Sequence, residues 1–278
     1  MMHFLKIDWA PSETLFKIGS FGIHIYSLMF VCAFALGYYL IKKIYEKEKI
    51  DVAHIENLFI YMIISVFLGA RLGDVFFYSW DYYQDHLIEI LLPIRETADG
   101  FKFIGFRGLA SHGAVIGVLI GLFLYQRKYT YKPIIWILDR VCIPVSIGAS
   151  FVRIGNFFNS EIVGKYTNTN FGVVFLNNGD TLPRHPAQLY EALGYFIIFL
   201  LLRSLYRNGY GQRKGFLIGA YFTSSFAIRF LVEFVKASQG GFEDALPMLS
   251  TGQWLSIPVI LLGLYFMIRS LQVKSTFE

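Results

Sequence analysis

Seven apolar segments of about 20 residues divide this sequence, and they limit what the chain can fold into. A bilayer core about 30 Å thick is crossed by about 20 apolar residues in a helix, so each segment has the length of a membrane span. The segments lie at about 20–41, 55–78, 108–126, 133–153, 187–206, 215–236 and 252–272. The fourth has the weakest pattern, because Asp139 and Arg140 interrupt it and Pro144 would kink a helix.

The composition argues against an ordinary soluble domain. Hydrophobic residues make up 55% of the 278 residues and charged residues 16%, whereas soluble domains contain roughly 45–50% and about 25%. A single buried core cannot hide this much apolar sequence. The sequence therefore predicts an all-α membrane protein, a bundle of about seven transmembrane helices that forms a single polytopic domain over residues 1–278.

Lysine and arginine cluster in the loops after the first, third and fifth segments, which predicts that these loops are cytoplasmic. The residues are Lys42, Lys43, Lys47, Lys49, Arg127, Lys128, Lys132, Arg203, Arg207, Arg213 and Lys214. The N-terminus is then outside, and the C-terminus, with Lys274, is inside. The longer outer segments, 79–107 and 154–186, predict a small periplasmic cap. Within the second, FGVVF predicts a short strand and NNGD a turn.

Other features argue against several kinds of function. Cys32 and Cys142 lie inside apolar segments, and no Cys/His spacing indicates a metal site. The net charge of +5 comes from basic loops of the kind that set topology or contact anionic lipids, so we expect no nucleic-acid partner. No apolar stretch with a cleavage site begins the chain, so we expect no removable signal peptide. GxxxG glycines in the second and third segments predict close helix packing.

Polar and ionisable residues from every segment reach a similar depth, near the outer leaflet, once the segments are oriented. They are Tyr26, Arg71, Asp74, His112, Arg153, His185, Gln188, Tyr190, Glu191, Arg229, Glu233 and Gln253. A charged side chain at a bilayer centre costs at least a few kcal/mol, so many at one depth predict a shared polar cavity. Arginine suits phosphate or carboxylate groups, and histidine exchanges protons near neutral pH.

These residues predict an anionic-ligand site at the outer leaflet and leave its purpose open. Phospholipid headgroups are the abundant anions at that depth, so an enzyme acting on lipids fits. A transporter or channel for small anions fits as well, and a non-catalytic lipid-binding scaffold is a third reading. For each pairing of an arginine with Glu161, Glu191 or Glu233, a salt bridge between helices is an equally good interpretation.

Several motifs resemble segments of the bacterial prolipoprotein diacylglyceryl transferase family. RIGNFFNSEIVG at 153–164 resembles the family signature at Arg153, Gly155, Asn156, Asn159, Glu161 and Gly164. SHGAVIG around His112, RHPAQLYEA at 184–192, RFLVEFVK at 229–236 and GQWLSIP at 252–258 resemble further family segments, as do Tyr26 and ARLGDVFFY. The sequence departs from the family pattern at Ala114, where many relatives have glycine, and at Ser225, where some have tyrosine.

The resemblance implies a reaction in the bacterial inner membrane that uses no metal or cofactor. Phosphatidylglycerol gives its diacylglyceryl group to the lipobox cysteine thiol of a preprolipoprotein, which forms a thioether and releases glycerol phosphate. His112, Arg153 and Arg229 are the implied catalytic residues. The implied substrate-binding residues are Tyr26, Arg71, Asn156, Asn159, Glu161, Gly164, His185, Gln188, Tyr190, Glu191 and Glu233.

Overall fold

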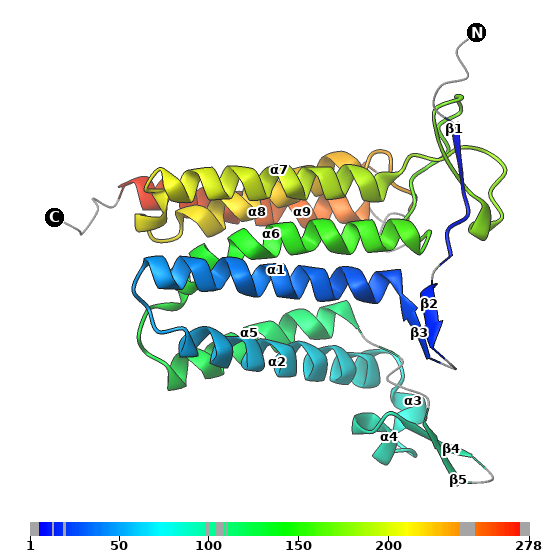
Figure 1. The fold of residues 1–278 in the computed structure, drawn as a ribbon, viewed down its shortest axis with the longest axis horizontal. Helices are drawn as coiled ribbons and strands as arrows, with labels where there is room; N and C mark the ends of the chain where they lie inside the picture. The colour runs from blue at the N-terminus through cyan, green and yellow to red at the C-terminus, as the bar shows by residue number, and fades with distance from the viewer. Residues whose placement is uncertain are drawn as a thin grey trace. The chain divides into compact units, whose positions relative to one another are not determined.

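The computed structural model describes residues 6–12, 14–18, 21–97, 100–103, 108, 110–238 and 248–272. Within them the protein is mostly helical, and each of the seven predicted segments forms a helix (Figure 1). These helices are α1 (Ile25–Lys47), α2 (Ala53–Phe77), α5 (Ser111–Lys128), α6 (Ile134–Phe158), α7 (Ala187–Arg207), α8 (Phe216–Val232) and α9 (Thr251–Gln272). Lys274 and residue 20, where the first predicted segment begins, lie outside the described residues.

Five helices of the described part are long and apolar enough to cross a membrane, namely α1, α2, α6, α7 and α9. Helix α8 is apolar but has only 17 residues. Helix α5 has 18 residues and ends in Gln126, Arg127 and Lys128, which shortens its apolar part. The prediction of a multi-pass helical protein is therefore confirmed. The count of about seven spans and their direction stay predictions.

Helix α6 continues without interruption through Asp139, Arg140 and Pro144. The Asp139 carboxylate accepts hydrogen bonds from the backbone N–H groups of Gly215 (2.7 Å) and Ile218 (2.9 Å), at the N-terminus of α8. The Arg140 guanidinium lies 4.1 Å from the centre of the Trp136 ring. The polar residues that weaken this segment in the sequence therefore have partners. Of the most apolar 18-residue stretch of α6, 56% is buried, against 6% in α1.

Contacts along the chain divide the protein into two compact units. The large unit comprises Met1–Ile44 and Ile135–Glu278 and contains most of α1 with α6, α7, α8 and α9. The small unit comprises Tyr45–Ile134 and contains α2 and α5. The prediction that 1–278 forms a single polytopic domain stays a prediction.

Short strands of the large unit lie outside its long helices. Strand β1 (Lys6–Trp9) pairs in parallel with β6 (Gly172–Phe175), and β2 (Thr14–Ile18) pairs antiparallel with β3 (Phe21–His24). The strand and turn predicted at FGVVF and NNGD are confirmed by β6 and by the 3-10 turn Leu176–Asn178, which ends at Gly179 with φ 76°. The first predicted segment starts too early, because strand β3 occupies residues 21–24 and α1 begins at Ile25. A second 3-10 turn, Tyr210–Gln212, precedes α8.

The small unit consists of the α2–α5 pair and a small group of short elements. These are α3 (Trp80–Tyr83), α4 (Ile88–Leu91) and a hairpin of β4 (Ile94–Thr97) and β5 (Gly100–Phe103). Helices α2 and α5 touch through glycines: a Cβ on Gly69 would lie 2.7 Å from Gly117 Cα, and one on Gly73 would lie 2.6 Å from Gly113 Cα. The close packing predicted from the GxxxG pattern is confirmed.

Candidate functional site

A buried carboxylate shared by two cations forms the centre of polar contacts in the large unit. Helix α6 supplies Arg153, the second turn of α7 supplies Glu191, and Lys236 follows the end of α8. Arg153 Nε lies 2.7 Å from Glu191 Oε2 in a close ion pair whose alignment falls short of a hydrogen bond. Lys236 Nζ donates to Glu191 Oε1 across 3.4 Å. Two cations therefore share one carboxylate, and both are held in place by it.

The signature segment after Arg153 forms a chain of hydrogen bonds. Arg153 Nη1 donates to Asn156 Oδ1 (3.2 Å), and Asn156 Nδ2 donates to Glu161 Oε1 (2.6 Å). Asn159 Nδ2 reaches the same oxygen at 3.5 Å, and Gln188 Nε2 donates to the Glu161 carbonyl (2.6 Å). Four predicted residues thereby hold one another and the Arg153 guanidinium in place.

Tyr26 joins this chain from α1. Its ring lies against Gly155, where an added Cβ would approach ring atom Cδ2 to 2.8 Å. Its side chain hydrogen-bonds with Asn156 and interacts electrostatically with Glu161 and Arg153. Glycine at 155 therefore makes room for the aromatic ring, and the signature segment and the first-helix tyrosine form one site.

Gly164 and His185 lie where three segments of the large unit meet. The Gly164 N–H donates to the His185 carbonyl (3.0 Å), and Gly164 and Lys236 form an isolated antiparallel β-bridge. An added Cβ on Gly164 would lie 2.6 Å from His185 Cβ and 2.8 Å from the Val235 carbonyl oxygen, so only glycine fits. His185 Nδ1 lies 3.2 Å from the Tyr190 hydroxyl. Gly164 therefore packs these segments together, and its substrate-binding role stays a prediction.

Arg229 and Glu233 lie at the C-terminal end of α8, and within the described residues no ion pair joins them. Arg229 Nε and Glu233 Oε2 are buried and make no hydrogen bond there. An added Cβ on Gly252, at the start of α9, would lie 2.6 Å from Glu233 Oε1, so a glycine gives this carboxylate its space. Buried polar atoms without partners cost about 1–3 kcal/mol each, so both atoms favour a ligand.

Two residues of the site were missing from the sequence-based set. Tyr195 interacts electrostatically with Glu191, Arg153 and Arg229, so it belongs to the same group of charges. It lies four residues after Glu191, on the same helix face, and that spacing could have identified it. Lys236 is only 6% exposed and was passed over inside RFLVEFVK, although a lysine beside an apolar run needs a partner.

The small unit holds Arg71 and His112. The Arg71 side chain is buried and donates to the backbone carbonyls of Ile90 (2.8 Å) and Glu89 (2.6 Å), which attaches α4 to α2. This arrangement favours a structural function for Arg71, and its predicted substrate contact stays a prediction. His112, the second residue of α5, is exposed, and its Nδ1 lies 3.5 Å from the Tyr78 hydroxyl.

Glu89 organises the short elements beyond α2. Its carboxylate accepts hydrogen bonds from the Tyr82 hydroxyl (2.8 Å) and the Glu96 N–H (2.7 Å). Burial by itself raises the pKa of Glu89, but these hydrogen bonds outweigh it and hold the pKa below its ordinary value. The same hydrogen bond to Glu89 raises the pKa of Tyr82.

Comparison with known proteins identifies the family. The model of the prolipoprotein diacylglyceryl transferase family matches residues 13–269. The phosphatidylglycerol–prolipoprotein diacylglyceryl transferase of Bacteroides fragilis is 41% identical over 266 residues, which cover 95% of either chain. That of Tolumonas auensis is 40% identical over 267 residues, covering 96% of this chain and 98% of the relative. That of Porphyromonas gingivalis is 36% identical over 280 residues, covering 96% and 95%. This chain belongs to the prolipoprotein diacylglyceryl transferase family.

Proposed function

We propose that this protein transfers the diacylglyceryl group of phosphatidylglycerol to the lipobox cysteine thiol of preprolipoproteins. The family supports the reaction, and the cluster of Arg153, Glu191 and Lys236 carries the proposal at the level of residues. That cluster holds a guanidinium and an ammonium in place through one carboxylate. Such a group suits the phosphate of the donor lipid.

The chemistry is a displacement at carbon. The cysteine sulfur forms a bond to the glycerol carbon that carries the phosphate, and the bond from that carbon to the phosphate oxygen breaks. The thiol proton leaves to a base, and glycerol phosphate leaves with the bonding electrons. Because a thiolate is the nucleophile, we assign His112 as the base. Arg153 and Arg229 neutralise the charge that develops on the leaving phosphate.

The remaining residues are assigned to position the lipid. Arg229 has a buried Nε that makes no hydrogen bond within the described residues, and a phosphate oxygen would satisfy it. Tyr26 and Asn156 hold Glu161 and Arg153 in fixed orientations, which reduces the rearrangement needed when the lipid binds. Glu233, Tyr190 and His185 are assigned contacts with the glycerol part of the lipid.

We also assign about seven spans in the inner membrane, with the N-terminus outside and the site towards the outer leaflet. The basic loops after the first, third and fifth segments support this direction. Single cysteines at Lys128 and at Asp85, introduced into a variant without Cys32 and Cys142, would be treated with a membrane-impermeant thiol reagent in intact cells. Labelling of the residue-85 cysteine but not of the residue-128 cysteine is expected, and the reverse result would overturn the direction.

Reconstitution with phosphatidylglycerol and a lipobox peptide tests the reaction, with mass spectrometry of the peptide to detect the diacylglyceryl adduct. Arg153→Ala is expected to lower transfer by about 10²–10³, the effect of removing one charge-stabilising donor. Arg203→Ala, at an exposed position of α7, is the matched control and should transfer normally. Normal transfer by Arg153→Ala would contradict its role. Anion flux without any adduct would instead support a transporter.

The assignment of His112 as base has a separate test. A free thiol has a pKa of about 8.5, so raising the pH above that value supplies thiolate without a base. His112→Gln is expected to be slow at pH 7 and to recover towards the parent rate near pH 9.5, whereas Arg153→Ala should not recover. An equal deficit of His112→Gln at both pH values would show that the histidine acts in some other way.

A further inference from the structure

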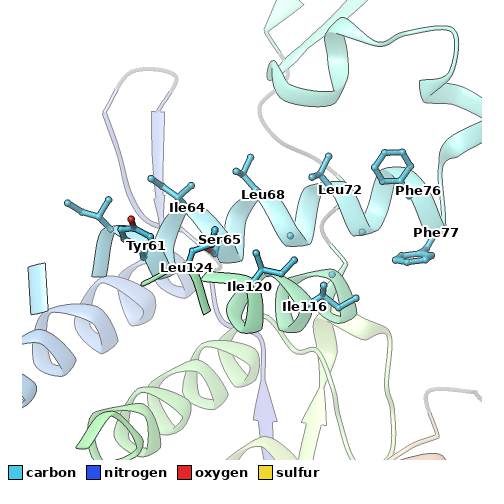
Figure 2. A pocket seen from close by; sticks show the side chains of 15 residues that line it. Tyr61, Ile64, Ser65, Leu68, Leu72, Phe76, Phe77, Ile116, Ile120 and Leu124 are labelled. Atoms are coloured by element: carbon cyan, nitrogen blue, oxygen red, sulfur yellow. The ribbon is translucent and has the colours of Figure 1, made fainter. Parts of the chain in front are cut away.

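A long apolar groove lies along the α2–α5 pair of the small unit (Figure 2). Its volume is about 660 Å³. One wall is a row of α2 side chains spaced four residues apart, which places them along one ridge of the helix. This row is Ile60, Ile64, Leu68, Leu72 and Phe76, and Ile116, Ile120 and Leu124 of α5 form the facing wall.

The floor of the groove is made of glycines. Gly69 and Gly73 of α2 and Gly113 and Gly117 of α5 also line it. Their Cα atoms are so close across the helix pair that an added Cβ would meet the partner backbone. Between the two ridges of larger side chains, these glycines leave a channel.

The dimensions of the groove favour a hydrocarbon chain as its occupant. From Ile60 to Phe76 the α2 wall extends about 24 Å at 1.5 Å per residue. A volume of about 660 Å³ over that length leaves a mean cross-section of roughly 27 Å². A methylene chain packed at about 4 Å from its neighbours needs only roughly 16–20 Å².

The chemistry along the groove changes at one end. Its walls are apolar and exposed, with Ile64, Ile120 and Ile116 each about half exposed. At the end marked by Phe77 and Gly113, the next residues are Tyr78 and His112, whose polar atoms lie 3.5 Å apart. An imidazole donates at least one hydrogen bond in either protonation state. A long apolar channel that ends at hydrogen-bond donors is complementary to an acyl chain with a phosphate headgroup.

We propose that the α2–α5 groove binds one acyl chain of a membrane phospholipid, with the headgroup at the His112 end. Lipid binding here does not depend on the transfer reaction. The interpretation of the groove as a site for the donor lipid rests on the proposed function, because the proposed reaction uses His112 as its base. On that reading the groove carries one chain of the donor and directs its phosphate to the catalytic histidine.

Photolabelling tests the groove without any turnover. The purified full chain would be mixed with a sub-stoichiometric amount of phosphatidylglycerol that carries a diazirine midway along one acyl chain. After irradiation, mass spectrometry of peptides locates the adducts. Labels are expected on residues 60–77 and 113–124, with a plateau as lipid is added. Labelling in proportion to exposed apolar surface on α7 and α9, or protection of α2 and α5 by a second copy, would overturn the proposal.

Two variants that fill the groove sharpen this test. Ile120→Trp and Ile64→Trp place an indole between the walls and are expected to weaken labelling of the groove about tenfold, the factor for losing burial of roughly two methylenes. Leu193→Trp, at a 61% exposed position of α7, is the matched control and should label like the parent. Unchanged labelling in both filled variants would overturn the proposal. Because transfer is not measured, that failure would leave the proposed reaction standing.

Discussion

The helices of the two units associate in different ways. In the large unit, α6, α7 and α8 bring charged side chains into the interior, and Glu191, 1% exposed, is held by Arg153 and Lys236. In the small unit, α2 and α5 pack backbone against backbone through glycines, and the Tyr125 hydroxyl of α5 donates to the His54 carbonyl of α2 (2.8 Å). Lipid is as apolar as leucine, so helices associate by close packing or by polar contacts.

The difference teaches where chemistry can reside. Polar partners fix side chains in direction, which a reaction needs, but each partner depends on the others. Glycine packing fixes only the helix backbones and leaves apolar surface free for lipid. We therefore expect the large unit to be sensitive to the loss of a single charge, and the small unit to be sensitive to added volume.

Glu191→Ala is expected to have the largest effect. Removing one partner of a buried ionic cluster typically costs about 3–5 kcal/mol, because the remaining charges stay buried. Transfer should also fall by about 100-fold, because Arg153 loses the group that orients it. Denaturation in detergent measures the stability, and the lipobox assay measures transfer.

Two further variants make this prediction specific. Glu191→Ala combined with Lys236→Met removes one of the buried cations and should recover part of the lost stability without recovering transfer. Asp81→Ala, which removes an exposed carboxylate, should change neither. If Glu191→Ala lowers the stability no more than Asp81→Ala does, the ion pairs do not stabilise the large unit.

Gly117→Leu tests the opposite principle in the small unit. An added side chain would collide with the Ser65 carbonyl and with the backbone of Gly69, so α2 and α5 must move apart. Overpacking of this kind costs about 1–3 kcal/mol. Val115→Leu, at a 61% exposed position two residues away, adds volume outside the contact and is the control. Equal denaturation midpoints for the two variants would contradict close glycine packing.

Asp139→Ala tests whether a polar residue in the large unit stabilises the fold without contributing to lipid binding. The carboxylate caps the N-terminus of α8 through Gly215 and Ile218, and loss of a capping side chain costs about 0.5–2 kcal/mol. Stability should fall by that amount, and the apparent KM for phosphatidylglycerol should not change. A change in KM with unchanged stability would place Asp139 in the lipid site.

The sequence predicts the helices better than it predicts their partners. Apolar length identifies all seven helical segments, and the GxxxG spacing predicts the α2–α5 contact. The signature motif predicts that Arg153, Asn156 and Glu161 act together, because they are close in sequence. Lys236 was missed because its partner Glu191 comes from α7, and Tyr195 because two of its three partners, Arg153 and Arg229, come from α6 and α8. Strand β1 was missed because its pairing with β6 joins residues more than 160 positions apart.

Lowering the pH is expected to have the smallest effect, a local loss of stability in the short elements beyond α2. Hydrogen bonds hold the pKa of Glu89 below its ordinary value of 4.5. A lowered folded-state pKa contributes stability above the unfolded pKa, and that stability is lost as pH falls through the folded pKa. Hydrogen exchange of residues 79–97 should therefore accelerate below about pH 4.5, beyond the intrinsic change with pH. Glu89→Gln should remove this dependence. If the parent and Glu89→Gln respond alike to acid, the carboxylate does not organise this region.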